Sequence, residues 1–419
     1  MAASQVTLRV YVRGGVAGGT LAESQWENKV FAEFEKQNPD IKLEIVTPSG
    51  SDYLDKLTLL WTTGDPPDVW DHGGAVATYV SQGWLLDLMP YVKRDLAELK
   101  AEDFFSGAWR AYQWGGHFWG MPFLSMPYPL LFNADLFEGA GLTTPPIDWD
   151  DASWTWDRLV EYARKLFRVG ADGRVQQLGV VVRTDGTVAP MYSWLWGGDW
   201  FDRDTYETSI PNKCTVLSRA NELAYQKLVE LARYGVAVNG EAGFWSGKVG
   251  MVVNDPLLDV MNGAIATQGK IRWGIAAIPR GTQPAALLAT DPWMVSSKTK
   301  HPEAAWRFIK YITSQKVMES YTTFGVAPVA RASALPEYLN RASKLSGYQS
   351  ARDVLTVLAG GQKYGREAYD HVISGWRPWL EQVSQRELPA MLSNQRSVSE
   401  VLTRIQEGMQ TGIANLRKK

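Results

Sequence analysis

The sequence is poor in the residues that most often build chemical centres. Cys214 is its only cysteine, so no internal disulfide and no cysteine-based metal site can form. Only 4 histidines occur, and no two stand at the spacing of metal ligands. The chain lacks both the Gly-x-Ser-x-Gly motif of serine hydrolases and the G-x-G-x-x-G motif of dinucleotide-binding proteins. We therefore predict no catalytic residue, no metal and no cofactor.

Two further absences restrict the partners. No apolar run approaches the roughly 18 to 20 residues that a membrane-spanning helix requires. Lys and Arg number 43 against 45 Asp and Glu, which leaves a formal charge of -2 without a basic stripe. Nucleic-acid binders show a basic surplus, so this class of function is excluded.

The length and the opening pattern favour an α/β protein with two lobes. At 419 residues the chain exceeds what one hydrophobic core usually serves. Alternating apolar residues predict strands at 6–12 and 41–45, with a helix between them. Ser24 stands three residues before Glu27, which is the capping-box spacing at a helix start. A β-α-β opening of this kind favours a parallel sheet covered by helices.

The same alternation of strands and helices continues along the chain. Thr155 is expected to cap a helix, and Pro302 is expected at the first position of another. The patterns predict further strands at 68–70, 118–123, 130–132, 249–253 and 273–278, and further helices at 53–61 and 397–416.

Tryptophan is unusually abundant, with 19 residues beside 17 Tyr and 13 Phe. One interpretation is a Trp-rich core, which we adopt for Trp61, Trp84 and Trp306 because helical or buried-turn spacing explains them. The other is that several indoles line a site for a molecule with flat apolar faces and polar edges.

Six segments resemble the family 1 extracellular solute-binding proteins of ABC importers, the maltose-binding-protein type. No single segment is specific, but their order and spacing across the chain are. They run from Phe34 to Ile45, Thr63 to Leu88, Phe118 to Leu142, Trp154 to Ala163, Phe244 to Met251 and Pro302 to Thr313.

The resemblance implies the periplasmic-binding-protein type II fold, with two α/β lobes, each a mixed sheet flanked by helices. It implies an N-terminal lobe of 1–125 with 290–325 and a C-terminal lobe of 131–286 with 331–419. Three hinge crossings are then expected near 125–131, 286–290 and 326–330.

Ligand-contacting residues are expected just after the carboxyl ends of strands, where open parallel sheets bind their ligands. In the first lobe and the first crossing this rule selects Arg13, Gly14, Gly15, Trp70, Asp71, His72, Ser125, Met126 and Tyr128. Elsewhere, stretches that resemble ligand-contacting positions of the family contribute Trp194, Trp196, Asp199, Asn254, Asp255, Asp291, Trp293, Trp376 and Arg377.

These residue types suit a sugar. The C–H face of a pyranose packs on an aromatic ring, and Asp and Arg form charge-assisted hydrogen bonds with its hydroxyl groups. Structural interpretations remain open: Asp71 as a helix cap, His72 as a loop histidine, and Trp200 and Trp379 as core residues.

The resemblance implies the substrate-binding component of an ABC importer that captures a sugar or oligosaccharide between the lobes by hinge closure. The expected partners are a carbohydrate ligand and a membrane permease, and we expect a monomer. We expect it in the periplasm or anchored outside the cell, with its export signal absent from this chain.

Two alternatives stay open. The same fold could bind another small polar or cationic solute, since several Trp can surround a quaternary ammonium. A carbohydrate-active enzyme is the second, because such enzymes line clefts with Trp and use paired carboxylates. The carboxylates clustered at 148–151 are better explained as a solvated loop before a helix.

Overall fold

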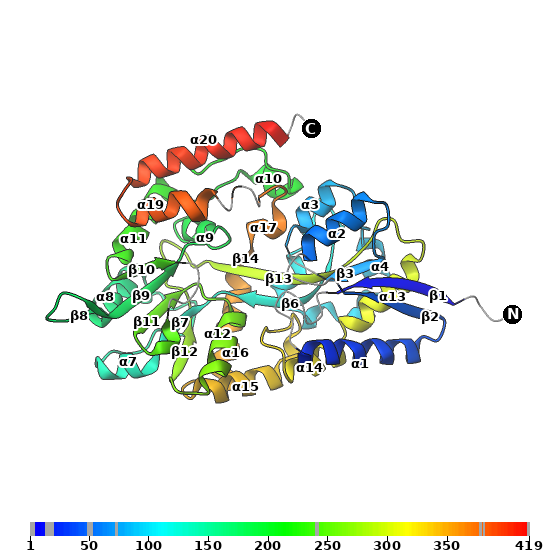
Figure 1. Ribbon diagram of the computed structural model, residues 1–419, viewed down its shortest axis with the longest axis horizontal. Coiled ribbons are helices and arrows are strands. Elements are labelled where there is room, and N and C mark those ends of the chain that lie inside the picture. Colours follow the sequence, from blue (N-terminus) through cyan, green and yellow to red (C-terminus); the bar gives the residue numbers. More distant parts are fainter. Residues whose placement is uncertain are drawn as a thin grey trace. The chain divides into compact units, whose positions relative to one another are not determined.

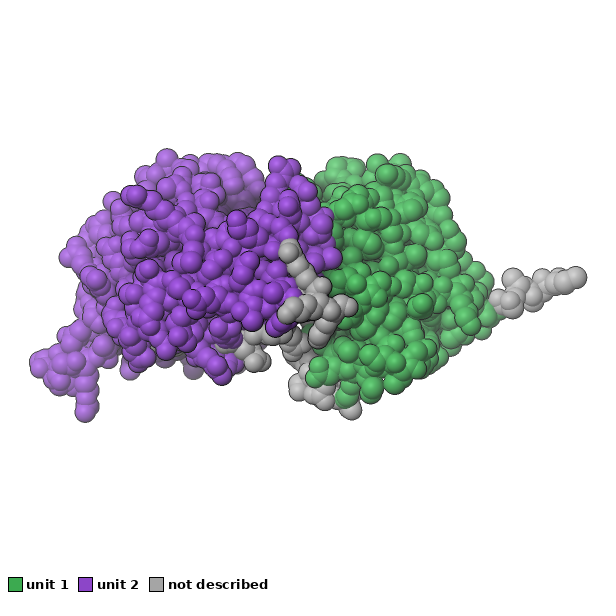
Figure 2. All heavy atoms as spheres, turned by 90° about the horizontal axis from the view of Figure 1, so that it is seen from above, with its two compact units in different colours: residues 1–125, 290–338 green, residues 126–289, 339–419 purple. Residues whose placement is uncertain are grey.

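The computed structural model describes residues 5–12, 21–47, 53–71, 74–238, 243–376, 379 and 382–416. The chain divides into two compact units, each built from separated stretches of sequence (Figure 2). Unit 1 comprises Met1–Ser125 and Thr290–Tyr338, and unit 2 comprises Met126–Ala289 and Leu339–Lys419. The chain therefore passes between the units three times, after Ser125, after Ala289 and after Tyr338.

Unit 1 is built on a mostly parallel sheet (Figure 1). Its elements are β1 (Val6–Tyr11), α1 (Leu21–Gln37), β2 (Ile41–Val46), α2 (Tyr53–Thr62), β3 (Val69–Asp71), α3 (Val76–Ser81), α4 (Met89–Arg94), α5 (Leu96–Leu99), η1 (Ala101–Asp103), α6 (Ser106–Arg110), β4 (Gln113–Trp114), β5 (His117–Phe118), α13 (Pro302–Ile312), α14 (Gln315–Thr322) and η3 (Ala332–Ala334). Strands β2, β1 and β3 are parallel neighbours, and β13 (Ala286–Val295) pairs antiparallel with β3.

Helices cover both faces of this sheet. On one face, α2 and α3 enclose a cluster around Tyr11 and Trp70. On the other, α1 contacts β2 and α13 contacts β1 (Figure 1). The strand alternation produces this arrangement, because Leu8 and Val10 point opposite to Tyr11 and all three are buried.

Three elements continue across a boundary between the units: β6 (Met121–Pro127), β13 and α15 (Pro336–Ser346). Strands β6 and β13 pair with each other. Two of the three passages are thus made by regular strands.

Unit 2 holds a second mixed sheet in the order β10-β9-β11-β7-β12. Its elements are β7 (Leu130–Asn133), α7 (Ala134–Gly139), α8 (Trp156–Leu166), β8 (Arg168–Val169), β9 (Val175–Arg183), α9 (Ala189–Trp194), α10 (Arg203–Thr208), α11 (Arg219–Ala232), β10 (Gly235–Val238), η2 (Phe244–Ser246), β11 (Val249–Val253), α12 (Leu257–Thr267), β12 (Trp273–Ala276), α16 (Ala351–Tyr364), β14 (Gly365–Glu367), α17 (Tyr369–Val372), η4 (Val383–Glu387), α19 (Leu388–Leu392) and α20 (Val398–Leu416).

In unit 2 the parallel strands β10, β9 and β11 end at one edge of the sheet, and the antiparallel β7 begins there. Helix α8 packs on β9 so closely that a Cβ on Gly179 would lie 1.9 Å from the carbonyl oxygen of Ala163. Only glycine permits this approach of helix to strand.

Several sequence-based predictions are confirmed. The predicted α/β class, with sheets flanked by helices, is correct. Thr155 caps α8 by accepting a hydrogen bond from the backbone N–H of Arg158, and Pro302 opens α13. The capping box at Ser24 is wrong, because α1 already begins at Leu21 and Ser24 lies inside it.

Candidate functional site

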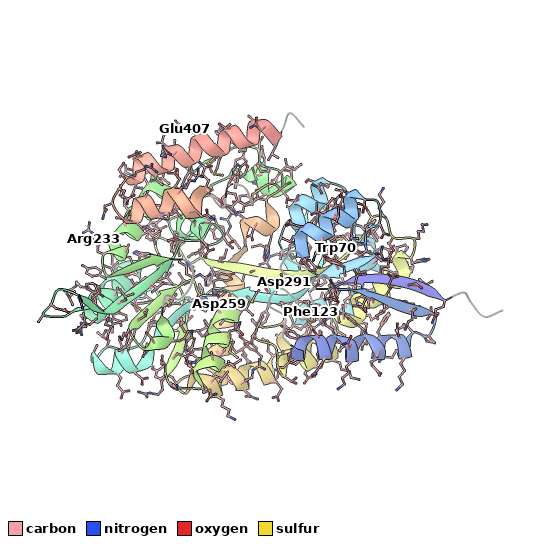
Figure 3. All side chains as sticks on the ribbon, in the orientation of Figure 1. Trp70, Phe123, Arg233, Asp259, Asp291 and Glu407 are labelled. Atoms are coloured by element: carbon pink, nitrogen blue, oxygen red, sulfur yellow. The ribbon has the colours of Figure 1, made fainter. Side chains whose placement is uncertain are left out.

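The candidate site in unit 1 is the sheet edge at which β1 and β3 end. Asp71 closes β3, and its backbone carbonyl accepts a hydrogen bond of 2.7 Å from the hydroxyl of Tyr53. Trp293 on β13 is paired with Asp71, so Asp291 extends past the end of β3 at the same edge (Figure 3). Asp71 and Asp291 are both partly exposed. These two carboxylates therefore lie at the same edge of the sheet.

The predicted indoles of unit 1 are buried beneath this edge. Trp70 is fully buried, with edge contacts to Trp61 and Tyr79 at centroid distances of 5.9 and 6.0 Å. Trp293 is also buried, against Phe308. Neither indole N–H has a hydrogen-bond partner among the described residues.

Ser125 and Met126, at the first passage between the units, are buried as well. The Ser125 hydroxyl lies 3.1 Å from the hydroxyl of Thr290, within unit 1. This contact joins β6 to β13 and has a structural role in the conformation described here.

The candidate site in unit 2 centres on Arg183, the last residue of β9. Its Nη1 lies 2.9 Å from Oδ1 of Asp255 and 2.9 Å from Oδ2 of Asp259, and its Nε lies 3.4 Å from Oδ2 of Asp185. Asp255 follows β11, and Asp259 lies in the first turn of α12 (Figure 3). One guanidinium therefore holds three carboxylates at the edge where β9 and β11 end.

Burial and neighbouring charges together set the pKa values of the groups at this edge. Burial lowers the pKa of Arg183, but Asp185 and Asp255 outweigh it and raise the pKa above its ordinary value. Burial, and then the charge of Asp185, raises the pKa of Tyr128 well above 10. At neutral pH the edge thus holds a permanent cation and a neutral phenol.

Asn254 stands between β11 and Asp255 in the left-handed region, with φ of 63°. It is fully buried, and its side chain lies beside the hydroxyl of Tyr192, which donates to the carbonyl of Arg183. A non-glycine residue in this conformation is uncommon and is often associated with a functional site.

A second polar cluster in unit 2 surrounds Asp199. Its carboxylate accepts hydrogen bonds from Arg366 at 2.6 Å, Tyr206 at 2.5 Å and the backbone N–H of Trp200 at 2.8 Å. The Tyr369 hydroxyl also donates to it. Burial first, and then nearby charged or phenolic groups, raise the pKa of both tyrosines well above 10, so both remain hydrogen-bond donors.

The predicted indoles of unit 2 lie in its core. The guanidinium of Arg366 covers the ring of Trp194 at 4.4 Å from the centroid, and Trp194 is buried. Trp196 packs on Trp156 at 5.2 Å. Trp376 is enclosed by aromatic rings, with Tyr369 at 5.1 Å.

Comparison with known proteins shows the family to which this chain belongs. A family model described as bacterial extracellular solute-binding protein matches residues 18–319, well over half of the chain. The chain belongs to this family. It is a solute-binding protein with an α/β fold typical of the group.

Individual relatives of this solute-binding protein are distant. A binding protein from Brucella abortus (strain 2308) is 25% identical over 349 residues, which cover 80% of each chain. A protein from Sinorhizobium fredii, named as an amino-acid ABC transporter periplasmic-binding protein, is 26% identical over 52% of this chain and 50% of its own.

The fold is shared with solved structures. An ABC substrate-binding protein from Listeria monocytogenes, in complex with cycloalternan, superposes with a TM-score of 0.74. The two sequences are 20% identical, and the match covers 98% of this chain and 100% of the other. At this identity the likeness concerns the fold.

Five predicted site residues of the solute-binding protein lie outside the described residues: Arg13, Gly14, Gly15, His72 and Arg377. Sequence reasoning missed six residues of the polar clusters: Arg183, Asp185, Asp259, Arg366, Tyr206 and Tyr369. Arg183 was accessible to the strand-end rule, because it ends a run of apolar residues. Arg366, Tyr206 and Tyr369 come from three separate elements, and no local pattern joins them to Asp199.

Across the described ranges, no group of three or more His, Cys, Asp or Glu side chains could hold a metal ion. In the same ranges, no helix of the solute-binding protein has the length and apolar character needed to cross a membrane.

Proposed function

We propose that this solute-binding protein is the substrate-binding component of an ABC importer and captures a sugar or oligosaccharide. The observation that carries the proposal is the cluster of Arg183, Asp185, Asp255 and Asp259 at the edge where β9 and β11 end. It presents the guanidinium of Arg183 as a fixed donor and the partly exposed Asp185 and Asp259 as acceptors, while Asp255 is buried and holds Arg183 in place. The charges of Asp185 and Arg183 both act on the phenol of Tyr128. Sugar hydroxyl groups both donate and accept hydrogen bonds, so an array of both kinds suits them.

Unit 1 supplies a second set of acceptors, Asp71 and Asp291, at the corresponding edge of its own sheet. We propose that residues of both units bind the same ligand. A ligand that requires both sets favours the conformation in which both reach it, which is hinge closure. The lobes of the proposal are 1–125 with 290–325 and 131–286 with 331–419, joined by hinges near 125–131, 286–290 and 326–330.

The aromatic part of the sequence-based site has less support. Trp70, Trp194, Trp293 and Trp376 are buried in their own units, so their faces are not available to a sugar in this conformation. We therefore base the proposal on the polar edges and on the cycloalternan bound by the Listeria monocytogenes protein, which is a carbohydrate. The tryptophans that remain partly exposed are Trp84, Trp109, Trp114, Trp119 and Trp245.

The proposal also includes a partner, an oligomeric state and a location. The liganded protein delivers its solute to a membrane permease and acts as a monomer, either in the periplasm or anchored outside the cell. It performs no covalent chemistry on the sugar. Incubation with maltohexaose should release no reducing ends, and their release would instead indicate a carbohydrate-active enzyme.

One observation favours a second ligand class. Three carboxylates surround a single guanidinium at the unit 2 edge, so the edge carries a net negative charge. Such an edge attracts a cation, for example the ammonium group of an amino acid. The Sinorhizobium fredii relative is named as part of an amino-acid transporter. A cationic solute is therefore the alternative.

A thermal-shift screen separates these ligands. A compound that binds only the native state stabilises it by mass action and so raises the melting temperature. At a concentration of 100 times Kd, the stabilisation is about 2.7 kcal/mol. We expect a rise with members of a panel of neutral mono- and oligosaccharides and none with lysine or arginine. A rise with the amino acids alone would replace the sugar proposal by its alternative.

A further inference from the structure

Asp199 has most of its hydrogen-bonding capacity already used. An ionised carboxylate has about four acceptor positions. Oδ1 takes the N–H of Trp200 and the hydroxyls of Tyr206 and Tyr369, and Oδ2 takes Nη2 of Arg366. Three donors thus share Oδ1, and Oδ2, which is bonded to Arg366, keeps about one acceptor position. The family resemblance nevertheless implies that Asp199 contacts the ligand directly.

Arg366 shows the opposite situation. A guanidinium carries five N–H donors, and within the described part of the chain the only acceptor of Arg366 is Asp199. Its guanidinium carbon lies over the rings of Trp194 and Tyr206, at 4.4 and 5.1 Å from their centroids, and these contacts, together with the bond to Asp199, restrict its orientation. The side chain keeps 38% of its surface exposed. Arg366 therefore has oriented donors that remain available.

The position of Arg366 connects it to the candidate edge of unit 2. On β14, Arg366 pairs with Leu287 of β13, and the carbonyl of Leu287 accepts the backbone N–H of Tyr128. The charges of Arg183 and Asp185 both act on the phenol of Tyr128. The charge of Asp370, four residues after Arg366, acts on the same phenol.

The charge of the cluster indicates the kind of ligand group. Asp199 neutralises Arg366 at 2.6 Å, and the two phenols carry no charge, so the cluster as a whole is neutral. The nearby Asp199 carboxylate would repel an anionic group of the ligand. The oxygen of a neutral hydroxyl group requires only a hydrogen-bond donor. Neutral oxygens are the better match.

We propose that Arg366 is a sugar-binding residue of unit 2, that it donates to neutral oxygens of the ligand, and that Asp199 is the residue that positions it. The inference rests on the proposed function, because it assigns a role within that site. It changes Asp199 from a ligand contact into a positioning residue.

The experiment begins with an array of neutral oligosaccharides and their uronic-acid counterparts. The neutral glycan that the wild type retains most strongly is then used in titration calorimetry. Arg366→Met should raise Kd about tenfold to hundredfold, the usual effect of losing charge-assisted hydrogen bonds. Arg366→Lys, which keeps the charge but loses the planar fork, should fall between Arg366→Met and the wild type.

Arg404→Met is the matched control. Arg404 also serves a buried carboxylate, Glu387, at 3.0 Å in the same unit, and its side chain is 47% exposed. The control should lower the melting temperature as Arg366→Met does, while leaving Kd unchanged. A Kd that changes equally in both variants would mean that general destabilisation causes the effect, and would overturn the assignment.

A double-mutant cycle then separates positioning from contact. If Asp199 acts only through Arg366, adding Asp199→Asn to Arg366→Met leaves Kd within about twofold of the single variant. Effects that multiply would show that Asp199 touches the sugar and would overturn its positioning role. Glycan binding that Arg366→Met leaves unchanged overturns this inference alone. Failure of the wild type to bind any glycan overturns the proposed function and, with it, Arg366 as a sugar-binding residue.

Discussion

Replacement of Arg183 by Met tests the electrostatic account of the unit 2 edge. Methionine keeps most of the apolar stem and removes the guanidinium that joins Asp185, Asp255 and Asp259. Asp255 has no exposed side-chain surface, so losing the guanidinium costs most stability at this carboxylate. Asp185 and Asp259 keep 22% and 37% of theirs and can turn toward water.

The magnitude follows from this difference in burial. Removing one partner of a buried ion pair costs about 3 to 5 kcal/mol, whereas partly exposed pairs contribute about 0 to 1 kcal/mol. For a unit of this size, such a loss lowers the melting temperature by about 6 to 20 °C. Asp255→Asn in the Arg183→Met background removes the buried charge, so it should recover more than half of the loss.

The pH dependence has a defined sign. In Arg183→Met, Asp255 stays buried but has lost its guanidinium partner. Its carboxyl group therefore binds a proton more readily in the folded variant than in the unfolded chain. The folded form is then stabilised as the pH falls. The difference in melting temperature between wild type and variant should therefore be larger at pH 8 than at pH 5.

Differential scanning calorimetry at several pH values measures both effects. Arg203→Met is the control, because Arg203 pairs with Glu207 on the surface with 89% of its side chain exposed. It should change the melting temperature by no more than a degree or two. An Arg183→Met variant as stable as this control would refute the reasoning, as would a destabilisation that grows toward acid pH.

Further predictions concern the fold. Gly179→Ala should prevent α8 from packing on β9, since the new Cβ would lie 1.9 Å from the carbonyl oxygen of Ala163; loss of the cooperative thermal transition measures this. Burial raises the pKa of Cys214 to about 11, so its thiol should not react with Ellman's reagent at pH 8 until urea unfolds unit 2. Ser350→Ala removes the capping box that Ser350 forms with Asp353 and should cost about 1 kcal/mol in urea denaturation.

Much of the fold could be predicted because its signals are local. Strand β11 was placed at 249–253 from an unbroken apolar run, and all five of its residues are buried. The N-cap Thr155 is equally local. The helix start predicted at Ser24 is wrong because the same capping pattern is also compatible with the interior of a helix. Helix α1 begins earlier, at Leu21.

The site could be predicted only in part. The strand-end rule selects Asp71, which is the last residue of β3, whereas Asp291 lies inside β13 and enters only through the family resemblance. The rule also selects Trp70, the residue before Asp71 in β3, which is fully buried. Sequence cannot tell on which face of a fully apolar strand an indole lies when both faces are covered by helices. For Arg366, contact with Asp199 depends on packing between distant elements.

The central claim is that one sugar is held by residues of both units. Titration calorimetry with the glycan that the wild type binds best tests it most directly, in Asp291→Asn of unit 1 and Tyr128→Phe of unit 2. The account predicts one glycan per chain and a Kd at least tenfold weaker in each variant, with unchanged melting temperatures in the absence of sugar. An unchanged Kd in either variant would contradict it.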